Sequence, residues 1–377
     1  MTRVLFLSVW YPHRYDAMAG LFVRKHALAV SQFAEVTVLY LHEDDRISKN
    51  EIIDQTTETI REIYVYYPKS RFSLIAYRSA FQAGWQYVVQ NYGRPNLTHV
   101  NVLGKQALSA YRLYKKYNIP YVVTEHWSGY MAENSEYHGV ARKCVVETIV
   151  RHARCIMPVS EHLALCMQGH GIRGNYCVVR NVVDDFFYSD PTVVLPSKTV
   201  RLLHVSCFDD KAKNVSGLLQ AVALLRKKRA DFTLTLVGTG RDFTFCRNIA
   251  QELGLSEICR FTGELPPAQV AERMHQSDVF VLSSNFETAG VVLQEAQAVG
   301  LPIVATRVGG IPEIVSDKEG ILVAPRDINA LADALDTMCN TFMQYDKAHI
   351  RARGKEYSFA AIGKQIHNIY KVSVQPR

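Results

Sequence analysis

One stretch, residues 279–315, constrains the fold more than any other part of the chain. It begins with a short apolar run, Val279–Leu282, which is the pattern of a buried strand. Apolar residues then recur at helical spacing over Val291–Val299, and a second apolar run follows at Ile303–Thr306. Strand, helix and strand within about thirty residues form a βαβ unit, which pairs its strands in parallel.

The start of this helix has the features of an anion site. The first N–H groups of a helix have no partner within the helix, so a diphosphate would suit Gly290, Val291 and Val292. Glu287 lies just before the helix, and Glu295 lies within it, eight residues later. A carboxylate accepts two hydrogen bonds at once, which suits the vicinal hydroxyls of a ribose or a hexose. A solvated helix with a surface pair of glutamates is the alternative.

The stretch also resembles the Glu-x7-Glu signature of the retaining glycosyltransferases of family 4. The match includes Ser284, three residues before Glu287, and the run Glu-Ala-x-Ala-x-Gly-x-Pro that starts at Glu295. The resemblance implies an α/β fold of the GT-B type, with two Rossmann-like, doubly wound, parallel-sheet domains that face a central cleft. It also implies that Glu287 meets the donor sugar and Glu295 the nucleotide ribose.

Composition sets limits on partners and metals. The 377 residues suffice for two domains, and 43 Lys and Arg against 36 Asp and Glu give a modest net charge of +7. No basic arm or tail indicates nucleic-acid binding, while weak attraction to anionic lipid stays open. The eight cysteines contain no C-x-x-C pair and no zinc spacing. We therefore expect free thiols, and the resemblance implies no metal and no cofactor.

The cellular location of the protein is predicted from two features that the sequence lacks. The apolar run 4–10 has no small-residue cleavage site and fits a first strand better than a signal peptide. No apolar run has transmembrane length. We expect a cytoplasmic protein, with peripheral contact at the inner face of the membrane left open.

Strands and helices alternate on both sides of a linker at 190–198, which contains Pro191 and Pro196. The pattern predicts an N-terminal domain over 1–190 and a second domain over 191–357. The resemblance implies that the first binds the acceptor and the second the nucleotide sugar. Residues 358–377 form a last helix with an apolar stripe at Phe359, Ile362, Ile366 and Tyr370. The resemblance implies that this helix crosses back onto the first domain.

Two loops of the first domain follow strands and are candidate site loops. The first contains His13, Arg14 and Tyr15 as acceptor candidates and ends at Gly20, which in the family faces the bond being made; a plain tight turn is the alternative. In the second, His126 matches the family histidine near the donor sugar. Trp127 and Tyr130 offer an acceptor sugar an apolar platform, or serve only as packing.

The second domain departs from the family pattern at one position. Where the family commonly has an arginine and a lysine for the donor diphosphate, this chain has Cys207 and Lys213, and Lys211 is a candidate substitute for the arginine. The catalytic candidates are His126, Glu287 and Lys213. The donor-binding candidates implied by the resemblance are Gly20, Ser206, Lys211, Lys213, Gly238, Gly263, Glu287, Thr288, Ala289, Gly290, Val291, Val292 and Glu295.

The resemblance implies transfer of a sugar from a UDP- or GDP-linked donor to a hydroxyl of an acceptor, with retention at the anomeric carbon and without a metal. The acceptor class is a glycan or a lipid-linked oligosaccharide, as in the assembly of cell-surface polysaccharides. Two alternatives remain open. One is a nucleotide-sugar 2-epimerase of the same fold, and the other is a non-catalytic sugar-binding protein.

Overall fold

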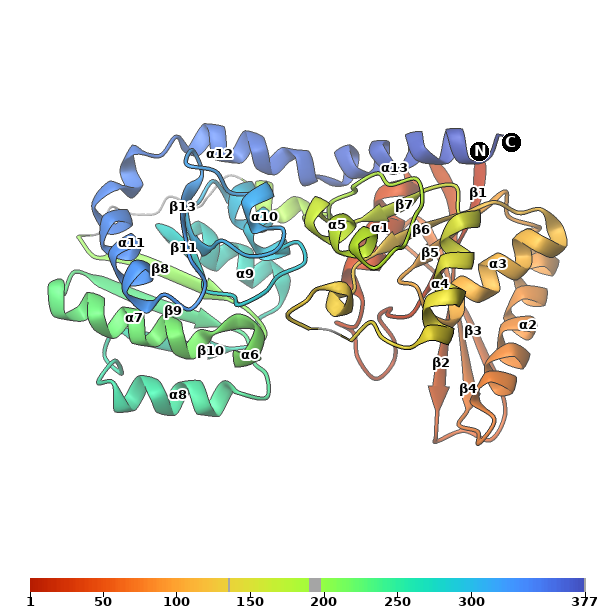
Figure 1. The fold of residues 1–377 in the computed structure, drawn as a ribbon, viewed down its shortest axis with the longest axis horizontal. Helices are drawn as coiled ribbons and strands as arrows, with labels where there is room; N and C mark the ends of the chain where they lie inside the picture. The colour runs from red at the N-terminus through yellow and green to blue at the C-terminus, as the bar shows by residue number, and fades with distance from the viewer. Residues whose placement is uncertain (135, 190–197, 376–377) are drawn as a thin grey trace. The chain divides into compact units, whose positions relative to one another are not determined.

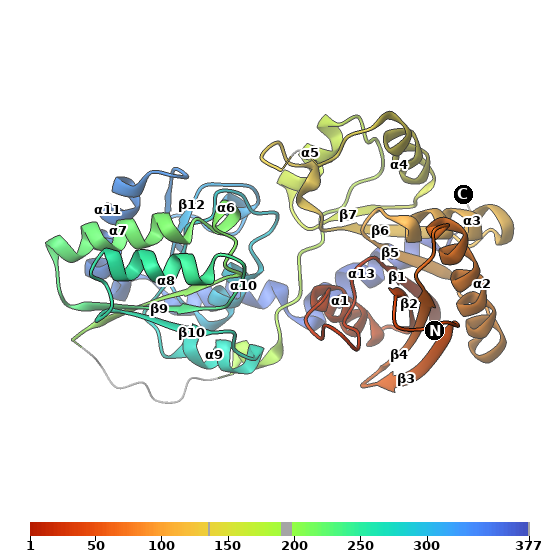
Figure 2. The ribbon, with the colours of Figure 1, turned by 90° about the horizontal axis from the view of Figure 1, so that it is seen from below.

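The computed structural model describes residues 1–134, 136–189 and 198–375, which form two compact units (Figures 1 and 2). The first unit contains Met1–Val182 and Phe359–Arg377, and the second contains Val183–Ser358. The division lies before the boundary predicted at 190, because Val183 and Phe187 are buried in the core of the second unit. The linker predicted at 190–198 lies outside the described residues except for Lys198.

The first unit contains a seven-stranded sheet in the order β3-β4-β2-β1-β5-β6-β7. Its strands are β1 (Thr2–Ser8), β2 (Ala34–Asp44), β3 (Glu51–Thr57), β4 (Ile60–Pro68), β5 (Leu97–Asn101), β6 (Tyr121–Glu125) and β7 (Ile156–Pro158). All pairings are parallel except that of β3, which runs antiparallel to β4. The sequence pattern does not predict β3, because this strand lies at the sheet edge and its polar, half-exposed residues give no apolar run.

Helices cover both faces of this sheet, as Figure 1 shows. They are α1 (Leu21–Ser31), α2 (Ser73–Tyr92), α3 (Lys105–Tyr117), α4 (Val140–His152), α5 (Glu161–Gly169) and α13 (Phe359–Ser373). The last helix packs on α1. Its apolar stripe, in which Ile362, Ile366 and Tyr370 are buried, completes the core that α1 forms with the sheet. The two helices approach closely at Gly363, where an added Cβ would lie 2.1 Å from the carbonyl oxygen of Ala29.

The second unit contains a six-stranded parallel sheet in the order β10-β9-β8-β11-β12-β13. Its strands are β8 (Val200–Val205), β9 (Phe232–Val237), β10 (Cys259–Gly263), β11 (Val279–Leu282), β12 (Ile303–Thr306) and β13 (Gly320–Val323). Alternate residues of the strands face two separate cores, since Leu202 and Val281 belong to one and Leu203 and Leu282 to the other. Both faces of the sheet are therefore covered.

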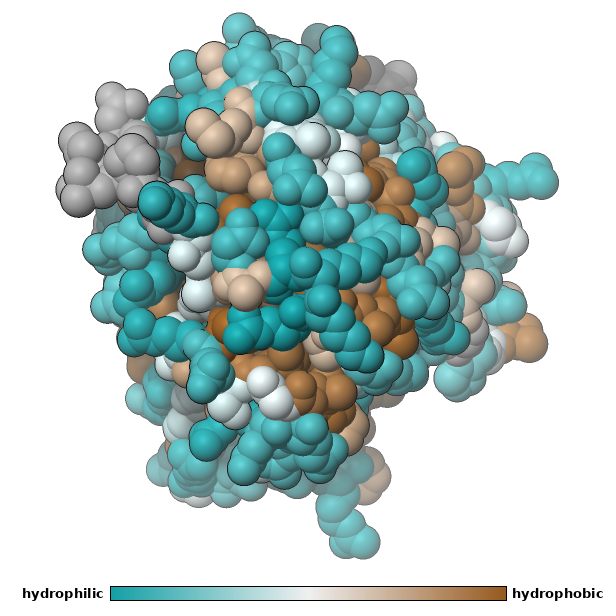
Figure 3. Space-filling view, turned by 90° about the vertical axis from the view of Figure 1, so that its left-hand side faces the viewer, coloured by the Kyte–Doolittle hydropathy of each residue, from teal (hydrophilic) through white to brown (hydrophobic). Residues whose placement is uncertain are grey.

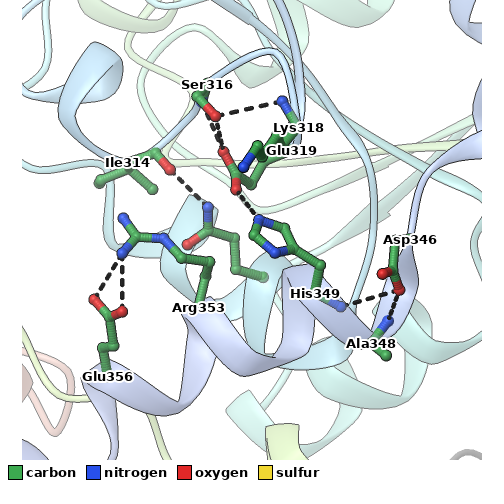
Figure 4. A network of polar contacts seen from close by, with 10 residues as sticks. Ile314, Ser316, Lys318, Glu319, Asp346, Ala348, His349, Arg353 and Glu356 are labelled. Carbon is green, nitrogen blue, oxygen red and sulfur yellow. Dashed lines mark hydrogen bonds and ion pairs between the residues drawn. The ribbon is translucent and has the colours of Figure 1, made fainter.

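The helices of this unit are α6 (Asp210–Lys213), α7 (Val215–Lys228), α8 (Phe243–Glu252), α9 (Pro267–His275), α10 (Val291–Val299), α11 (Ile328–Thr341) and α12 (Lys347–Gly354). The face of the unit in Figure 3 is mostly hydrophilic, with hydrophobic residues visible between the polar ones. Polar contacts hold α12 against the loop before β13 (Figure 4). His349 on α12 lies 2.8 Å from a carboxylate oxygen of Glu319, whose other oxygen accepts from Ser316.

Candidate functional site

The carboxyl ends of β8 and β11 bring together the loops that carry the donor-binding candidates. The turn after β11 is fixed to α6, because the Ser283 hydroxyl donates to the carbonyl oxygens of Lys213 and Asn214, at 2.9 and 3.1 Å. The backbone N–H of Asn285 donates to the carbonyl of Ala212 at 2.7 Å. The resemblance assigns no role to these polar residues. They hold the backbone that presents Lys213 beside the turn that presents Glu287.

Lys213 and Glu287 form an ion pair across these two loops. The Lys213 Nζ lies 2.5 Å from Glu287 Oε2, and both side chains are largely shielded, with exposed fractions of 16% and 12%. Burial by itself would lower the pKa of Lys213, but the Glu287 carboxylate outweighs it and raises the pKa, so the amine stays charged. The pair places a fixed cation and a hydrogen-bond acceptor side by side at the sheet edge.

The start of α10 lies beside this pair. Gly290 has the left-handed backbone, with φ at 59°, and an added Cβ would lie 3.5 Å from Glu287 Cγ. Within the described part of the chain, the N–H groups of Val291 and Val292 have no hydrogen-bond acceptor. Thr288 is half-buried and Ala289 buried in the loop that leads to Gly290. These N–H groups and the Lys213 amine offer a diphosphate both dipolar and full positive charge.

The loop after β12 fixes the backbone of Glu287 from the other side. Gly309 has φ at 51°, and an added Cβ would lie 1.7 Å from the carbonyl oxygen of Glu287. The hydroxyl of Thr306 donates to the carbonyl of Ser284 at 2.5 Å. The resemblance gave these residues no role, although a pair of adjacent glycines, here Gly309 and Gly310, signals a turn.

The other donor candidates of this unit fall into two groups. Ser206, Gly238 and Gly263 meet at the ends of β8, β9 and β10: the N–H of Gly238 donates to Gly263 at 2.8 Å, and Ser206 hydrogen-bonds His204 at 2.7 Å. Burial lowers the pKa of His204 to about 4, so its ring is neutral. Glu295 is half-buried on α10, whereas Lys211 and Cys207 are exposed.

In the first unit, Gly20 begins α1 with φ at 60°, and an added Cβ would lie 2.3 Å from the Trp10 carbonyl. The acceptor candidates of the preceding loop contact the ends of β2 and β4. Arg14 pairs with Asp44 and Glu51 at 2.5 and 2.7 Å, and Tyr15 donates to Asp44 at 2.5 Å. His13 packs against His42 with ring centroids 4.1 Å apart, and burial lowers its pKa. His13 and Arg14 line a cavity of about 450 Å³.

His126 lies at the end of β6 and is oriented through Glu125. One oxygen of the Glu125 carboxylate accepts the N–H groups of His126 and Trp127, both at 2.9 Å, and the other accepts from Leu103 at 3.0 Å. The His126 ring packs 4.4 Å from that of Phe22, and its Nε2 has no hydrogen-bond partner among the described residues. Burial, and then the nearby His26, hold the pKa of His126 well below its usual value, so the imidazole is neutral.

The prediction that Tyr130 is a platform for an acceptor sugar is wrong. Its side chain is 1% exposed and packs against Trp127 and Tyr137, with centroids 5.1 and 4.7 Å apart. The alternative, packing, is what the structure shows. Trp127 is half-buried, with the guanidinium of Arg142 over its ring at 4.2 Å.

Val182 lies in the turn 181–184, at the end of the first unit's main segment. Its φ is not positive and its side chain is fully buried. The position therefore tolerates a β-branched residue, which contributes to the first core.

Cavity volume alone would favour a different place on the second unit as the ligand site. A cavity of about 880 Å³ is lined by Arg201, Thr233 and Cys259, among others. These residues belong to the first halves of β8, β9 and β10, whereas the donor candidates follow the ends of the strands. In parallel α/β sheets ligands bind beyond the carboxyl ends, so this cavity does not replace the donor site.

Comparisons with known proteins agree with this geometry. The model of the family "Glycosyltransferase Family 4" matches residues 26–185, and that of "Glycosyl transferases group 1" matches residues 190–354. D-inositol 3-phosphate glycosyltransferase from Corynebacterium urealyticum is 33% identical over 175 residues, which are 43% of this chain and 40% of that protein. The putative colanic acid biosynthesis glycosyltransferase WcaL from Escherichia coli is 29% identical over 197 residues, 50% of this chain and 48% of that protein. The matches thus span less than half the length of these curated relatives.

Solved structures share the fold. That of Anabaena HepE in complex with UDP superposes with a TM-score of 0.75 and 17% identity, and the match covers 98% of this chain and 100% of that one. Among the helices that the structure describes, none has the length and hydropathy of a membrane span. Two family models that together cover both units, and a fold shared over nearly the whole chain, establish that this chain belongs to glycosyltransferase family 4 and has the GT-B fold.

Proposed function

We propose that this chain is a retaining, metal-independent glycosyltransferase that moves a sugar from a UDP- or GDP-linked donor to a hydroxyl of a glycan or lipid-linked acceptor. The observation that carries the proposal is the Lys213–Glu287 pair beside the uncapped N–H groups of α10. A diphosphate needs fixed positive charge, and the amine and the helix start supply it without a metal ion. That the related HepE was solved with UDP supports a uridine nucleotide as the first donor to test.

In this proposal Glu287 changes partner when the donor binds. Without ligand its carboxylate accepts from Lys213 at 2.5 Å. A donor phosphate competes for that amine, which leaves the carboxylate to accept hydrogen bonds from hydroxyls of the sugar. Glu295, about one turn into the helix, accepts from the ribose. The ion pair thus neutralises the charges of Lys213 and Glu287 until the donor takes its place.

The reaction breaks the bond between the anomeric carbon and the diphosphate oxygen and forms a bond from that carbon to the acceptor oxygen on the same face. The proton of the acceptor hydroxyl passes to the departing phosphate, so no dedicated carboxylate base is needed. The leaving nucleoside diphosphate gains negative charge, which Lys213 and the start of α10 stabilise. His126, as a neutral imidazole, donates to a sugar hydroxyl or to the departing phosphate.

Donor binding can be tested without knowing the acceptor. The melting temperature of the protein is measured with UDP, GDP, ADP and their glucose, galactose and mannose conjugates. We expect one nucleotide class to raise it. Lys213→Ala and Glu295→Ala should each weaken nucleotide affinity by about tenfold to a hundredfold, as expected for one charged hydrogen bond.

Lys228→Ala is the matched control, because Lys228 also pairs with a carboxylate, at 2.6 Å from Asp333, but on an exposed surface. It should leave nucleotide affinity unchanged. Equal losses in Lys228→Ala and Lys213→Ala would contradict the site, as would the absence of any shift with every nucleotide. Chromatography of the donor after incubation distinguishes hydrolysis or transfer from conversion to an epimer, and only the former agrees with the proposal.

A further inference from the structure

The first unit has a long stretch without negative charge. Between Glu62 and Glu125 the chain contains no Asp or Glu, although at its average of 36 acidic residues in 377 such a stretch would hold about six. The same stretch contains eight Lys or Arg, all of them exposed: Lys69, Arg71, Arg78, Arg94, Lys105, Arg112, Lys115 and Lys116. Among the described residues, none of these eight forms a salt bridge. Their charge is therefore uncompensated at the surface.

Two neighbouring helices carry most of these cations. Helices α2 and α3 lie side by side in both ribbon views (Figures 1 and 2). Tyr77 on α2 lies 3.5 Å from the hydroxyl of Ser109 on α3, and the rings of Trp85 and Tyr117 stack with centroids 5.7 Å apart. The two helices thus run in the same direction with their starts together. On α3, the cations Lys105, Arg112 and Lys116 recur at helical spacing and share one exposed face.

Exposed apolar side chains gather at the start of α2. Phe72, Leu74 and Ile75 are 69%, 61% and 66% exposed, in a segment that also carries Lys69, Arg71 and Arg78. Folded proteins rarely leave three large apolar chains this close together in water unless they meet a partner. We call these six residues, together with the exposed cations of α3, the α2–α3 surface.

We propose that the α2–α3 surface docks on a membrane that contains anionic phospholipid, with Phe72, Leu74 and Ile75 inserted among the acyl chains. The charge is complementary to anionic headgroups, which attract clusters of exposed Lys and Arg. The apolar triplet favours a bilayer over a nucleic acid, whose backbone offers nothing for such side chains to enter. No membrane-spanning segment is required, since basic and apolar residues act together as two weak anchors.

The position of this surface fits a lipid-linked acceptor. Helices α2 and α3 begin after β4 and β5, so their starts lie at the same edge of the first sheet as the loops with Gly20 and His126. The inference deepens the proposed function by assigning the surface at which a lipid-linked acceptor is reached. It rests on the proposed function only for that acceptor. The experiment below uses no donor, so its failure would leave nucleotide binding untouched.

The test is sedimentation of the full chain with vesicles of phosphatidylcholine alone and with added phosphatidylglycerol. We expect at least about tenfold tighter binding to the anionic vesicles at 0.1 M salt, and weaker binding as salt screens the charges. Arg71→Ala/Arg78→Ala should weaken binding about tenfold or more, because each cation near the surface contributes a factor of about five. Leu74→Ser/Ile75→Ser should weaken it about tenfold at the same net charge.

Two matched variants serve as controls. Arg226→Ala/Lys227→Ala removes two exposed charges from α7 in the second unit, and Leu165→Ser/Met343→Ser removes two exposed apolar chains elsewhere. Both should bind vesicles like the unmodified chain, and all four variants should keep its melting temperature, because the altered side chains are exposed. The proposal is overturned if anionic vesicles bind no better than neutral ones, or if the control pairs weaken binding as much as the α2 pairs. Tight binding to an oligonucleotide without vesicle binding would also overturn it.

Discussion

At the scale of single residues, Glu125 is the buried charge that sets the geometry next to His126. Its carboxylate accepts three backbone N–H groups and lies in the interior at the end of β6. The resemblance predicts a role for His126 but none for Glu125. A glutamate at the end of a buried strand gives no signal of its own, because only the fold shows which N–H groups converge on it.

Glu125 makes the stability of the first unit depend on pH. Burial raises its pKa to about 7, against the lowering effect of the three backbone hydrogen bonds. Because the folded-state pKa lies above the unfolded value of 4.5, the stability gained from the protonated form is complete below that value and is lost as pH rises through about 7.

We therefore expect the difference in free energy of unfolding between the unmodified chain and Glu125→Gln to change by an amount on the order of 2 kcal/mol between pH 5 and 8. The unmodified chain should be relatively more stable at pH 5. Urea titrations at four pH values measure this, and titrations of other groups largely cancel in the difference. A difference that stays constant with pH would show that Glu125 keeps an ordinary pKa.

At the scale of elements, the sequence predicts best where a pattern is both apolar and periodic. The βαβ unit around α10 is confirmed, with the helix at Val291–Val299 and its end at Gly300, which has φ at 89°. In contrast, β3 and α12 went unpredicted. One is a polar edge strand. The other, Lys347–Gly354, buries a single large apolar side chain, Ile350, and makes polar contacts such as that between His349 and Glu319 (Figure 4). Periodicity carries no information about such elements.

The candidate site was predictable in a similar, partial way. The resemblance assigns Lys213, Glu287 and Gly290 to one donor site, and the structure brings these residues together, because the two loops follow neighbouring strands of one parallel sheet. The motif says nothing about Ser283, Thr306 or Gly309, which act through backbone contacts between loops distant in sequence. The burial of Tyr130 could likewise not be predicted from the sequence, because aromatic residues in loops occur both in packing and as platforms for sugars.

Gly363 allows a test of the packing between α13 and α1. Replacing a helical glycine by alanine normally stabilises a protein by up to about 1 kcal/mol. At Gly363 the added Cβ would lie 2.1 Å from the backbone oxygen of Ala29, so we expect Gly363→Ala to destabilise the first unit by about 1–3 kcal/mol. Urea denaturation measures the change.

Gly169→Ala on α5 is the matched control, because an added Cβ there meets no atom within 4 Å. It should leave stability unchanged or raise it. If both substitutions stabilised the chain to the same degree, the close approach of the two helices would not hold in solution.

At the scale of the whole molecule, the two units have separate cores, and this predicts separable unfolding. Ile366 on α13 is fully buried in the core of the first unit. We expect Ile366→Ala to lower the stability of that unit by about 2–5 kcal/mol, the usual cost of truncating a buried isoleucine. The proposed nucleotide site lies in the second unit, so the affinity for the preferred nucleotide should stay within about twofold of the unmodified value.

Calorimetry with and without nucleotide measures both quantities in one preparation. Two transitions are expected, of which only one shifts with ligand and only the other shifts with Ile366→Ala. A single transition that responds to both changes would show that the two cores unfold as one cooperative unit.

The return of α13 to the first unit has a consequence for the order in which the chain acquires its structure during synthesis. When residues 1–182 have been synthesised, all strands of the first sheet are present. The helix α13, whose Ile362, Ile366 and Tyr370 complete the core of the first unit, has not yet been made. The intervening unit, Val183–Ser358, is continuous and can mature as soon as it emerges. The first unit is therefore synthesised first but completed last. The apolar face of its helix α1 stays uncovered until α13 is made. We therefore expect nascent chains of intermediate length to bind chaperones.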